Sequence, residues 1–185
     1  MKEKKIRAIY DSDSVIVYQA FNKIIAESAI LNQTFISPPF KIERMTWIKP
    51  SFLWMMYRSG WATKENQEHI LAIRIKRSGF EWALKNSCLS NFNETVHISQ
   101  QSWKEEMKNA PVRIQWDPER DIFLQPLSHR SIQIGLTGIA VEKYIKEWII
   151  NIEDITEQCK QIHELIRKNE ISQATMMLPD EKEYY

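Results

Sequence analysis

Glycine is scarce in this chain of 185 residues, which contains only four: Gly60, Gly79, Gly135 and Gly138. An average composition of about 7% glycine would give roughly 13. The four glycines are too scattered to form a P-loop or a dinucleotide-binding G-x-G-x-x-G motif. Because such loops hold phosphate with backbone amides, any phosphate site in this chain must be built from side chains.

Cysteines and long apolar segments are also few. Cys88 and Cys159 lie far apart and have no CxxC partner, which predicts free thiols in a reducing compartment. The longest apolar stretch, Phe52 to Tyr57, is far too short to cross a bilayer. The N-terminal segment has no apolar core of a signal peptide. We therefore expect a cytoplasmic protein without a membrane partner.

The histidines give no metal-binding pattern. None of His69, His97, His129 and His163 lies three or four residues from another, and no cysteine accompanies them at ligand spacing. The G-x-S-x-G elbow of many hydrolases is absent as well. The sequence thus predicts no metal, and leaves open only a site assembled from distant residues.

The charges are balanced overall but unevenly distributed. Lys and Arg number 25 and Asp and Glu 24, a net charge of +1 that is low for a protein that coats DNA. Residues 41–77 carry eight basic and three acidic side chains, whereas residues 142–185 carry ten acidic and six basic ones. The basic middle favours an anionic partner, although a solvated surface accounts for it equally well.

Short apolar strands alternate with helical segments along the chain, which predicts an α+β fold. We expect a single domain over residues 1–178, with a mixed or antiparallel central sheet, flanking helices and a C-terminal helical segment, and a flexible tail at 179–185. Strands are expected at 15–18, 42–48, 70–76, 112–116 and 131–136. Helices are expected near 21–31, 51–59, 80–85 and 99–109, from 139 to 152, and from Asp154 or Thr156 onward.

Three of the expected strands place polar side chains on one face, because alternate residues of a strand share a face. These polar residues are Arg113, Gln115 and Asp117, then Ser131 and Gln133, and finally Arg44 and Thr46. The polar faces indicate either a solvent-facing sheet or a polar cleft. Glutamine favours the cleft, since its amide both donates and accepts hydrogen bonds and suits sugar hydroxyls.

The expected helix at 51–59 places Trp54 and Arg58 on one side, and Gly60 is typical of a residue that ends a helix. Arginine beside tryptophan can stack on a base and pair with a phosphate. The alternative is that Trp54 belongs to the core and Arg58 interacts with the helix C-terminus.

Six segments in order resemble the DUF4291 family, a domain of unknown function, over a span from about Arg7 to Thr156. They are Arg7-x-Ile-Tyr10, Val17-Tyr-Gln-Ala-Phe21, Arg44-Met-Thr-Trp-Ile-Lys-Pro50, Trp54-Met-Met-Tyr-Arg-Ser-Gly60, Val112-Arg-Ile-Gln-Trp-Asp-Pro-Glu-Arg120 and Arg130-Ser-Ile-Gln-Ile-Gly-Leu136. This family name implies no activity.

The segment Val17-Tyr-Gln-Ala-Phe21, with the helix after it, is also similar to the opening of ADP-ribosyltransferase-like domains. That likeness implies NAD bound without a glycine loop, Gln19 and Arg44 on the ADP-ribose part, and Thr46 near the nicotinamide. It implies a catalytic carboxylate in Gln115-x-Asp117-x-Glu119. The chain departs from the pattern, with Gln19 in place of histidine or arginine and Asp117 in place of glutamate, so a pseudo-enzyme is the alternative.

The hypothesis is a nucleotide-handling domain, either an NAD-dependent transferase or a pseudo-enzyme. Its candidate catalytic residues are Gln115, Asp117 and Glu119. Its candidate ligand- and phosphate-binding residues are Arg7, Tyr18, Gln19, Arg44, Thr46, Lys49, Arg58 and Arg130. One alternative is a module that binds RNA or another single-stranded nucleic acid through the basic middle and its tryptophans. Another is a protein-interaction domain that uses the acidic C-terminal helices.

Overall fold

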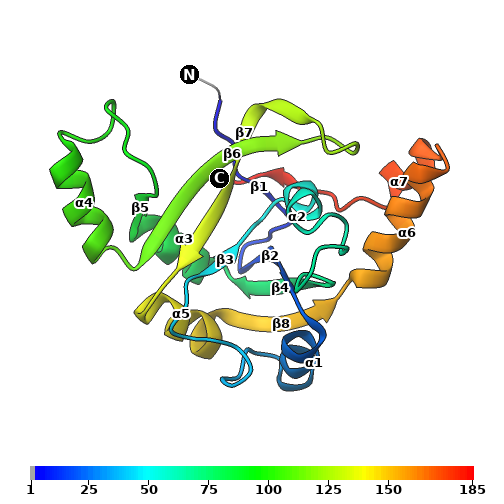
Figure 1. Cartoon of the computed structure of the whole chain (residues 1–185), viewed down its shortest axis with the longest axis horizontal. Coiled ribbons are helices and arrows are strands. Elements are labelled where there is room, and N and C mark those ends of the chain that lie inside the picture. Colours follow the sequence, from blue (N-terminus) through cyan, green and yellow to red (C-terminus); the bar gives the residue numbers. More distant parts are fainter. Residues whose placement is uncertain (1–2) are drawn as a thin grey trace.

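The computed structural model describes residues 3–185, which form two main β-sheets surrounded by helices (Figure 1). The first sheet is antiparallel, in the order β2 (Ser14–Phe21), β4 (His69–Lys76) and β8 (Ile149–Asp154). The second has the order β3 (Thr46–Ile48), β7 (Pro126–Leu136), β6 (Val112–Arg120) and β5 (Ser87–Leu89). Since β5 runs parallel to β6 and the other pairs are antiparallel, the predicted α+β class with mixed and antiparallel strands is confirmed.

The helices pack around the edges of the sheets. α1 (Lys23–Asn32) contacts β8, α4 (Gln100–Asn109) lies beyond β5, and α6 (Thr156–Arg167) with α7 (Ile171–Met176) lies on the opposite side (Figure 1). No helix among residues 3–185 is long and apolar enough to span a membrane. α6 buries Cys159 and Ile162, and the docking of a protein partner on these helices stays a prediction.

The two sheets meet at one point of their backbones. Tyr18 of β2 donates its N–H to the carbonyl of Lys49, and Lys49 donates its N–H to the carbonyl of Tyr18, at 2.7 and 3.2 Å. β3 is shorter than predicted, because residues 42–45 form turns. The bridge fixes Lys49 between the sheets, directly after the short strand β3.

Helix α2 (Phe52–Ser59) lies across this junction and contacts both β2 and β6. The hydroxyl of Ser51 caps its N-terminus by accepting the Trp54 N–H at 3.2 Å. Gly60 ends it with a φ of 60°, a left-handed conformation that glycine adopts without steric cost. The predicted helix and its stop are therefore confirmed.

The prediction of a single amphipathic helix over residues 139–152 is wrong. α5 (Ile139–Lys143) continues as a π-helical turn, η1 (Tyr144–Trp148), and the chain then enters β8. The isoleucines of this segment fit a helical period, but the backbone pairs with β4, where Ile152 lies opposite Ile73. The Gln33 side chain accepts the Ile152 N–H at 2.8 Å and donates to its carbonyl at 3.1 Å, so it satisfies backbone groups at the outer edge of β8.

The C-terminal residues expected to form a flexible tail are instead tied to the N-terminal segment. β9 (Lys182–Glu183) pairs antiparallel with β1 (Arg7–Ala8). Tyr184 packs edge-on against Tyr10, with ring centroids 4.9 Å apart. This pairing depends on a strand at the far end of the chain, which no pattern within residues 179–185 contains.

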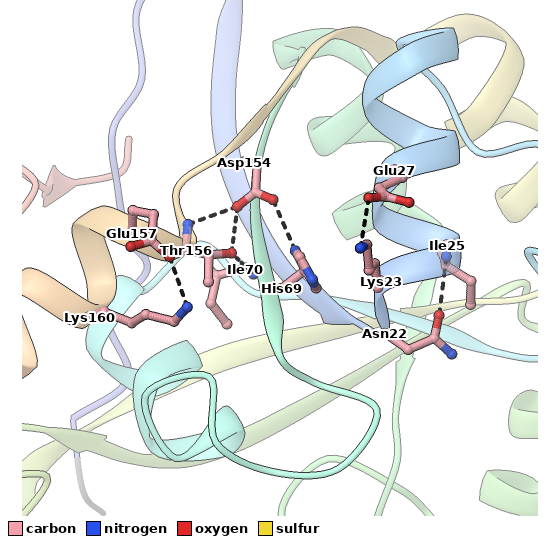
Figure 2. A network of polar contacts seen from close by, with 10 residues as sticks. All are labelled: Asn22, Lys23, Ile25, Glu27, His69, Ile70, Asp154, Thr156, Glu157 and Lys160. Atoms are coloured by element: carbon pink, nitrogen blue, oxygen red, sulfur yellow. Dashed lines mark hydrogen bonds and ion pairs between the residues drawn. The ribbon is translucent and has the colours of Figure 1, made fainter.

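The start of α6 is fixed by a polar network centred on Asp154 (Figure 2). One carboxylate oxygen contacts Nδ1 of His69 at 3.1 Å, and the other accepts the backbone N–H and the hydroxyl of Thr156 at 2.9 and 2.5 Å. The Thr156 hydroxyl accepts the N–H of Ile70 at 2.9 Å. Burial alone would raise the pKa of Asp154, but the bonds from Thr156 and His69 outweigh it and lower that pKa.

Candidate functional site

A polar cavity of about 440 Å³ lies between α2 and the sheet that contains β3, β6 and β7. We call it the central pocket. Its lining residues are Trp47, Lys49, Trp54, Tyr57, Arg58, Gln115, Asp117 and Gln133. A smaller hollow of about 220 Å³, the side pocket, shares Trp47, Lys49 and Arg58 with it.

The carboxylate of Asp117 is held by two glutamine side chains on neighbouring strands. Gln115 lies opposite Gln133 in the register of β6 and β7. The amide nitrogen of Gln115 donates to one oxygen of Asp117 at 3.0 Å, and that of Gln133 donates to the other at 2.8 Å. This pairing fixes the carboxylate and leaves the amide oxygens of both glutamines as acceptors at the pocket.

Lys49 brings a buried amine to the same pocket. Only 7% of its surface is exposed, and its Nζ donates to the carbonyl of Trp47 at 3.2 Å. No carboxylate among residues 3–185 lies within ion-pair distance of this amine. Burial, reinforced by the positive charge of Arg58 and partly opposed by Asp117, lowers the pKa of Lys49 to about 7.

The α2 side of the pocket combines aromatic rings with a free cation. Trp54 and Tyr57 stack with centroids 5.1 Å apart, and the Arg120 guanidinium lies 3.6 Å from the Tyr57 ring centre. The indole Nε1 of Trp54 is buried and has no hydrogen-bond partner among the described residues. Arg58 is exposed and forms no ion pair within the described part of the chain. The pocket thus offers rings for stacking and a guanidinium for an anion.

The structure brings together about half of the site residues predicted from the sequence. Lys49, Arg58, Gln115 and Asp117 line the central pocket, and Gln19 and Thr46 line the side pocket. The Gln19 amide is fully engaged, donating to the Thr46 hydroxyl at 2.6 Å and accepting from Tyr144 at 2.7 Å. Gln19 therefore positions Thr46 and Trp47 rather than presenting free polar atoms.

The remaining predicted residues lie elsewhere. Arg44 is exposed at a hollow formed with α1 and the loop at Phe40. Arg130 donates to the carbonyl of Trp116 at 2.7 Å and lines a separate hollow with Lys4. Tyr18 is 2% exposed and packs edge-on against Phe52 in the core.

Glu119 and Arg7 lie at the N-terminal end of α2, away from Asp117. A register shift between Pro118 and Arg120 interrupts the strand pairing after Asp117, so Glu119 does not follow Gln115 and Asp117, with which the resemblance had grouped it. Glu119 instead accepts the hydroxyl of Ser51 at 2.9 Å. The structure thus separates the two predicted catalytic carboxylates.

A second carboxylate, Glu181, also lies at this end of α2. It accepts the N–H of Phe52 at 2.6 Å. Burial, with a contribution from Glu119, raises the pKa of Glu181 to about 8. Arg7 lines the same hollow and donates to the Glu181 carbonyl at 2.5 Å, so these groups fasten the C-terminal segment to α2.

Gln133 and Trp47 line the pocket but were not among the candidate residues. Gln133 was recognisable as a polar residue on a strand, and its role became visible only with the β6–β7 register that sets it opposite Gln115. Trp47 lies against Gly135, where an added Cβ would approach its ring to 3.0 Å. Among residues 3–185, no three His, Cys, Asp or Glu side chains gather closely enough to hold a metal ion.

The fold and the pocket define an α+β domain with a polar site made of side chains. The sequence matches the family model described as Domain of unknown function (DUF4291) over residues 5–184, and the chain belongs to this family. The match extends past the expected limit at Thr156 and includes β9. No curated protein matches the chain in a sequence search.

Proposed function

We propose that the chain is a nucleotide-handling domain whose central pocket binds a phosphorylated ribosyl ligand. The observation that carries this proposal is the Asp117 carboxylate, fixed by Gln115 and Gln133 in a cavity that also holds Lys49 and Arg58. Such a ligand needs acceptors for hydroxyls and donors for phosphate, and the pocket supplies both.

Each part of the ligand has a matching group. Ribose hydroxyls donate to the carboxylate of Asp117 and to the free amide oxygens of the two glutamines. The guanidinium of Arg58, which has no ion-pair partner in the described chain, binds phosphate oxygens. The base stacks on the aromatic side of α2, where Trp54 and Tyr57 already stack on each other.

The same arrangement supports an NAD-dependent transferase as the activity. A positive charge develops on the ribose as the bond to nicotinamide breaks, and a fixed carboxylate such as Asp117 stabilises that charge. We expect NAD incubated with the chain to release nicotinamide, and Asp117→Asn to abolish the release. Binding of NAD without release would identify a pseudo-enzyme.

Calorimetric titration with ADP-ribose, AMP, ribose 5-phosphate and adenosine tests the binding. We expect the three phosphorylated compounds to bind. Arg58→Ala should weaken their affinity by about tenfold to a hundredfold, which corresponds to the loss of a charge-assisted hydrogen bond. Arg44→Ala is the matched control, because Arg44 is an exposed arginine at another hollow. Equal affinity for adenosine and AMP, or equal losses in both variants, would contradict the proposal.

A second candidate ligand is single-stranded nucleic acid. A hollow of about 710 Å³ shares Gln115 with the central pocket and is lined by Lys4, Trp116 and Arg130. The ammonium of Lys4 lies 5.5 Å from the Trp116 ring centre, a combination of cation and ring that suits stacked bases. Binding of an oligonucleotide that weakens with salt and with Arg130→Ala would favour this candidate.

A further inference from the structure

The amine of Lys49 has an unusual setting for a lysine. It is almost fully buried, lines both the central and the side pocket, and has a single hydrogen bond within residues 3–185, to the backbone oxygen of Trp47. Buried lysines are normally paired with a carboxylate. Here the pairing carboxylate is absent from the described residues, and Asp117 is engaged with two glutamines.

This setting favours the neutral form of the amine. The charged groups that act on it are Arg58 from α2, which disfavours its protonation, and Asp117 from β6, which favours it. With a pKa of about 7, the amine is neutral at neutral pH roughly a thousandfold more often than an exposed lysine. A neutral amine is a nucleophile, and desolvation among cationic groups is a recognised way to activate one.

We propose that Lys49 is a nucleophilic lysine that forms a reversible imine with a phosphorylated aldehyde or ketone bound in the central pocket. The proposal rests on the phosphate-binding function proposed above, because Arg58 holds the phosphate while the carbonyl meets the amine. An open-chain sugar phosphate belongs to this class of ligand.

The step balances without any further reactant. The lone pair of Nζ attacks the carbonyl carbon, the C–N bond forms and the carbonyl π bond breaks. Both amine hydrogens then leave with the carbonyl oxygen as water, and the C=N bond remains. Asp117, which lines the same pocket, is the carboxylate available to transfer protons between nitrogen and oxygen.

Pyridoxal 5′-phosphate is a suitable probe, since it combines an aldehyde, a ring and a phosphate. The full chain is incubated with the probe, reduced with borohydride, and mapped by peptide mass spectrometry. We expect Lys49 to be the main labelled lysine, with a labelling rate that rises as the pH passes through 7. We expect AMP to protect it, and Lys49→Met to abolish the label.

Lys64→Arg is the matched control, because Lys64 is an exposed lysine at the end of α2 whose Nζ donates to the carbonyl of Arg58 at 2.8 Å. It should leave the labelling unchanged. Even labelling of many exposed lysines in the wild-type chain, which needs no variant, would overturn the proposal. Binding of AMP without labelling of Lys49 would overturn the proposal of an imine but would agree with a nucleotide site in the central pocket. Labelling of Lys49 without AMP binding or protection would overturn the nucleotide site alone.

Discussion

Asp154 and Asp117 each accept hydrogen bonds on both carboxylate oxygens, and the two side chains serve different purposes. Asp154 is bound by His69 and Thr156, at the point where β8 passes into α6 (Figure 2). Asp117 is bound by the side-chain amides of two glutamines on neighbouring strands, and no helix begins at this point. The donors to Asp154 complete the secondary structure, whereas the donors to Asp117 hold a carboxylate at a cavity.

The surroundings of the two carboxylates differ in the same way. Near Asp154 a possible cation, His69, is in contact with the carboxylate at 3.1 Å. Near Asp117, Lys49 is buried without an ion pair and Trp54 has a buried indole nitrogen without a partner among the described residues. Unsatisfied buried polar groups lower stability. The Asp154 network therefore stabilises the fold, whereas the buried groups at the central pocket lower its stability, as expected for the ligand site that we propose.

The largest expected effect is on the pH dependence of stability. The pKa of Lys49 falls from 10.5 to about 7 on folding, so the unfolded chain holds this proton more tightly. The contribution of Lys49 to the free energy of unfolding should therefore rise between pH 7 and 10.5, by up to about 1.4 kcal/mol for each pH unit. Denaturant titrations should show this slope in the difference between the wild type and Lys49→Met, because other groups, such as Glu181, titrate in both proteins. If the free energies of unfolding of the two proteins differed by the same amount at every pH, burial of the amine would carry no cost in stability.

The next effect concerns the carboxylate at the pocket. Asp117→Ala should weaken the affinity for ADP-ribose, measured by calorimetry, by about a hundredfold, because the acceptor for the ribose hydroxyls is lost. Its free energy of unfolding should change by less than about 1 kcal/mol, since the two released amides face a cavity that water can enter. A large loss of stability without a loss of affinity would reverse the roles assigned to the two aspartates.

Asp154→Ala should show the opposite pattern. We expect a loss of about 1–2 kcal/mol in the free energy of unfolding, because the hydrogen bonds from Thr156 and His69 to the carboxylate are lost, with affinity for ADP-ribose unchanged. Urea titration measures the first quantity and calorimetry the second. Asp180→Ala serves as the control, as that aspartate makes no hydrogen bond within residues 3–185. A weaker affinity of Asp154→Ala for ADP-ribose would show that the Asp154 network also supports the central pocket, and would contradict this separation of roles.

The smallest effect is expected from a change behind the pocket. In Gly135→Ala, the new Cβ would lie 2.8 Å from the sulfur of Met45 and 3.0 Å from the ring of Trp47. Relief of this overlap should cost about 1 kcal/mol of stability and shift Trp47. Intrinsic tryptophan fluorescence and ligand affinity should both change slightly. Gly138→Ala should lower stability without shifting Trp47, because nothing lies within 4 Å of its added Cβ and its cost comes from the positive φ of 52°.

Local sequence patterns predicted the elements that depend on local interactions. The alternation in residues 70–76, the serine before α2 and Gly60 after it determine structure within a few residues. The same patterns failed where distant partners decide. The sequence of β8 has the apolar spacing of a helix, but its backbone pairs with β4. Residues 182–183 form a strand because β1 lies beside them.

The candidate site was predictable to a similar extent. Strand alternation predicted that Gln115 and Asp117 share a polar face, and the helix pattern indicated Arg58. The resemblance that grouped Glu119 with Asp117 did not predict the register shift after Pro118, beyond which Glu119 contacts Ser51. The pairing of Gln115 with Gln133 depends on which strands are neighbours, and no pattern within one strand contains that information.

The most direct test is a crystal structure of the chain with ADP-ribose. We expect the ligand to lie in the central pocket, with ribose hydroxyls on the Asp117 carboxylate and a phosphate on Arg58. A ligand seated in the hollow of Lys4 and Arg130, or an empty central pocket at a saturating concentration of ADP-ribose, would contradict it.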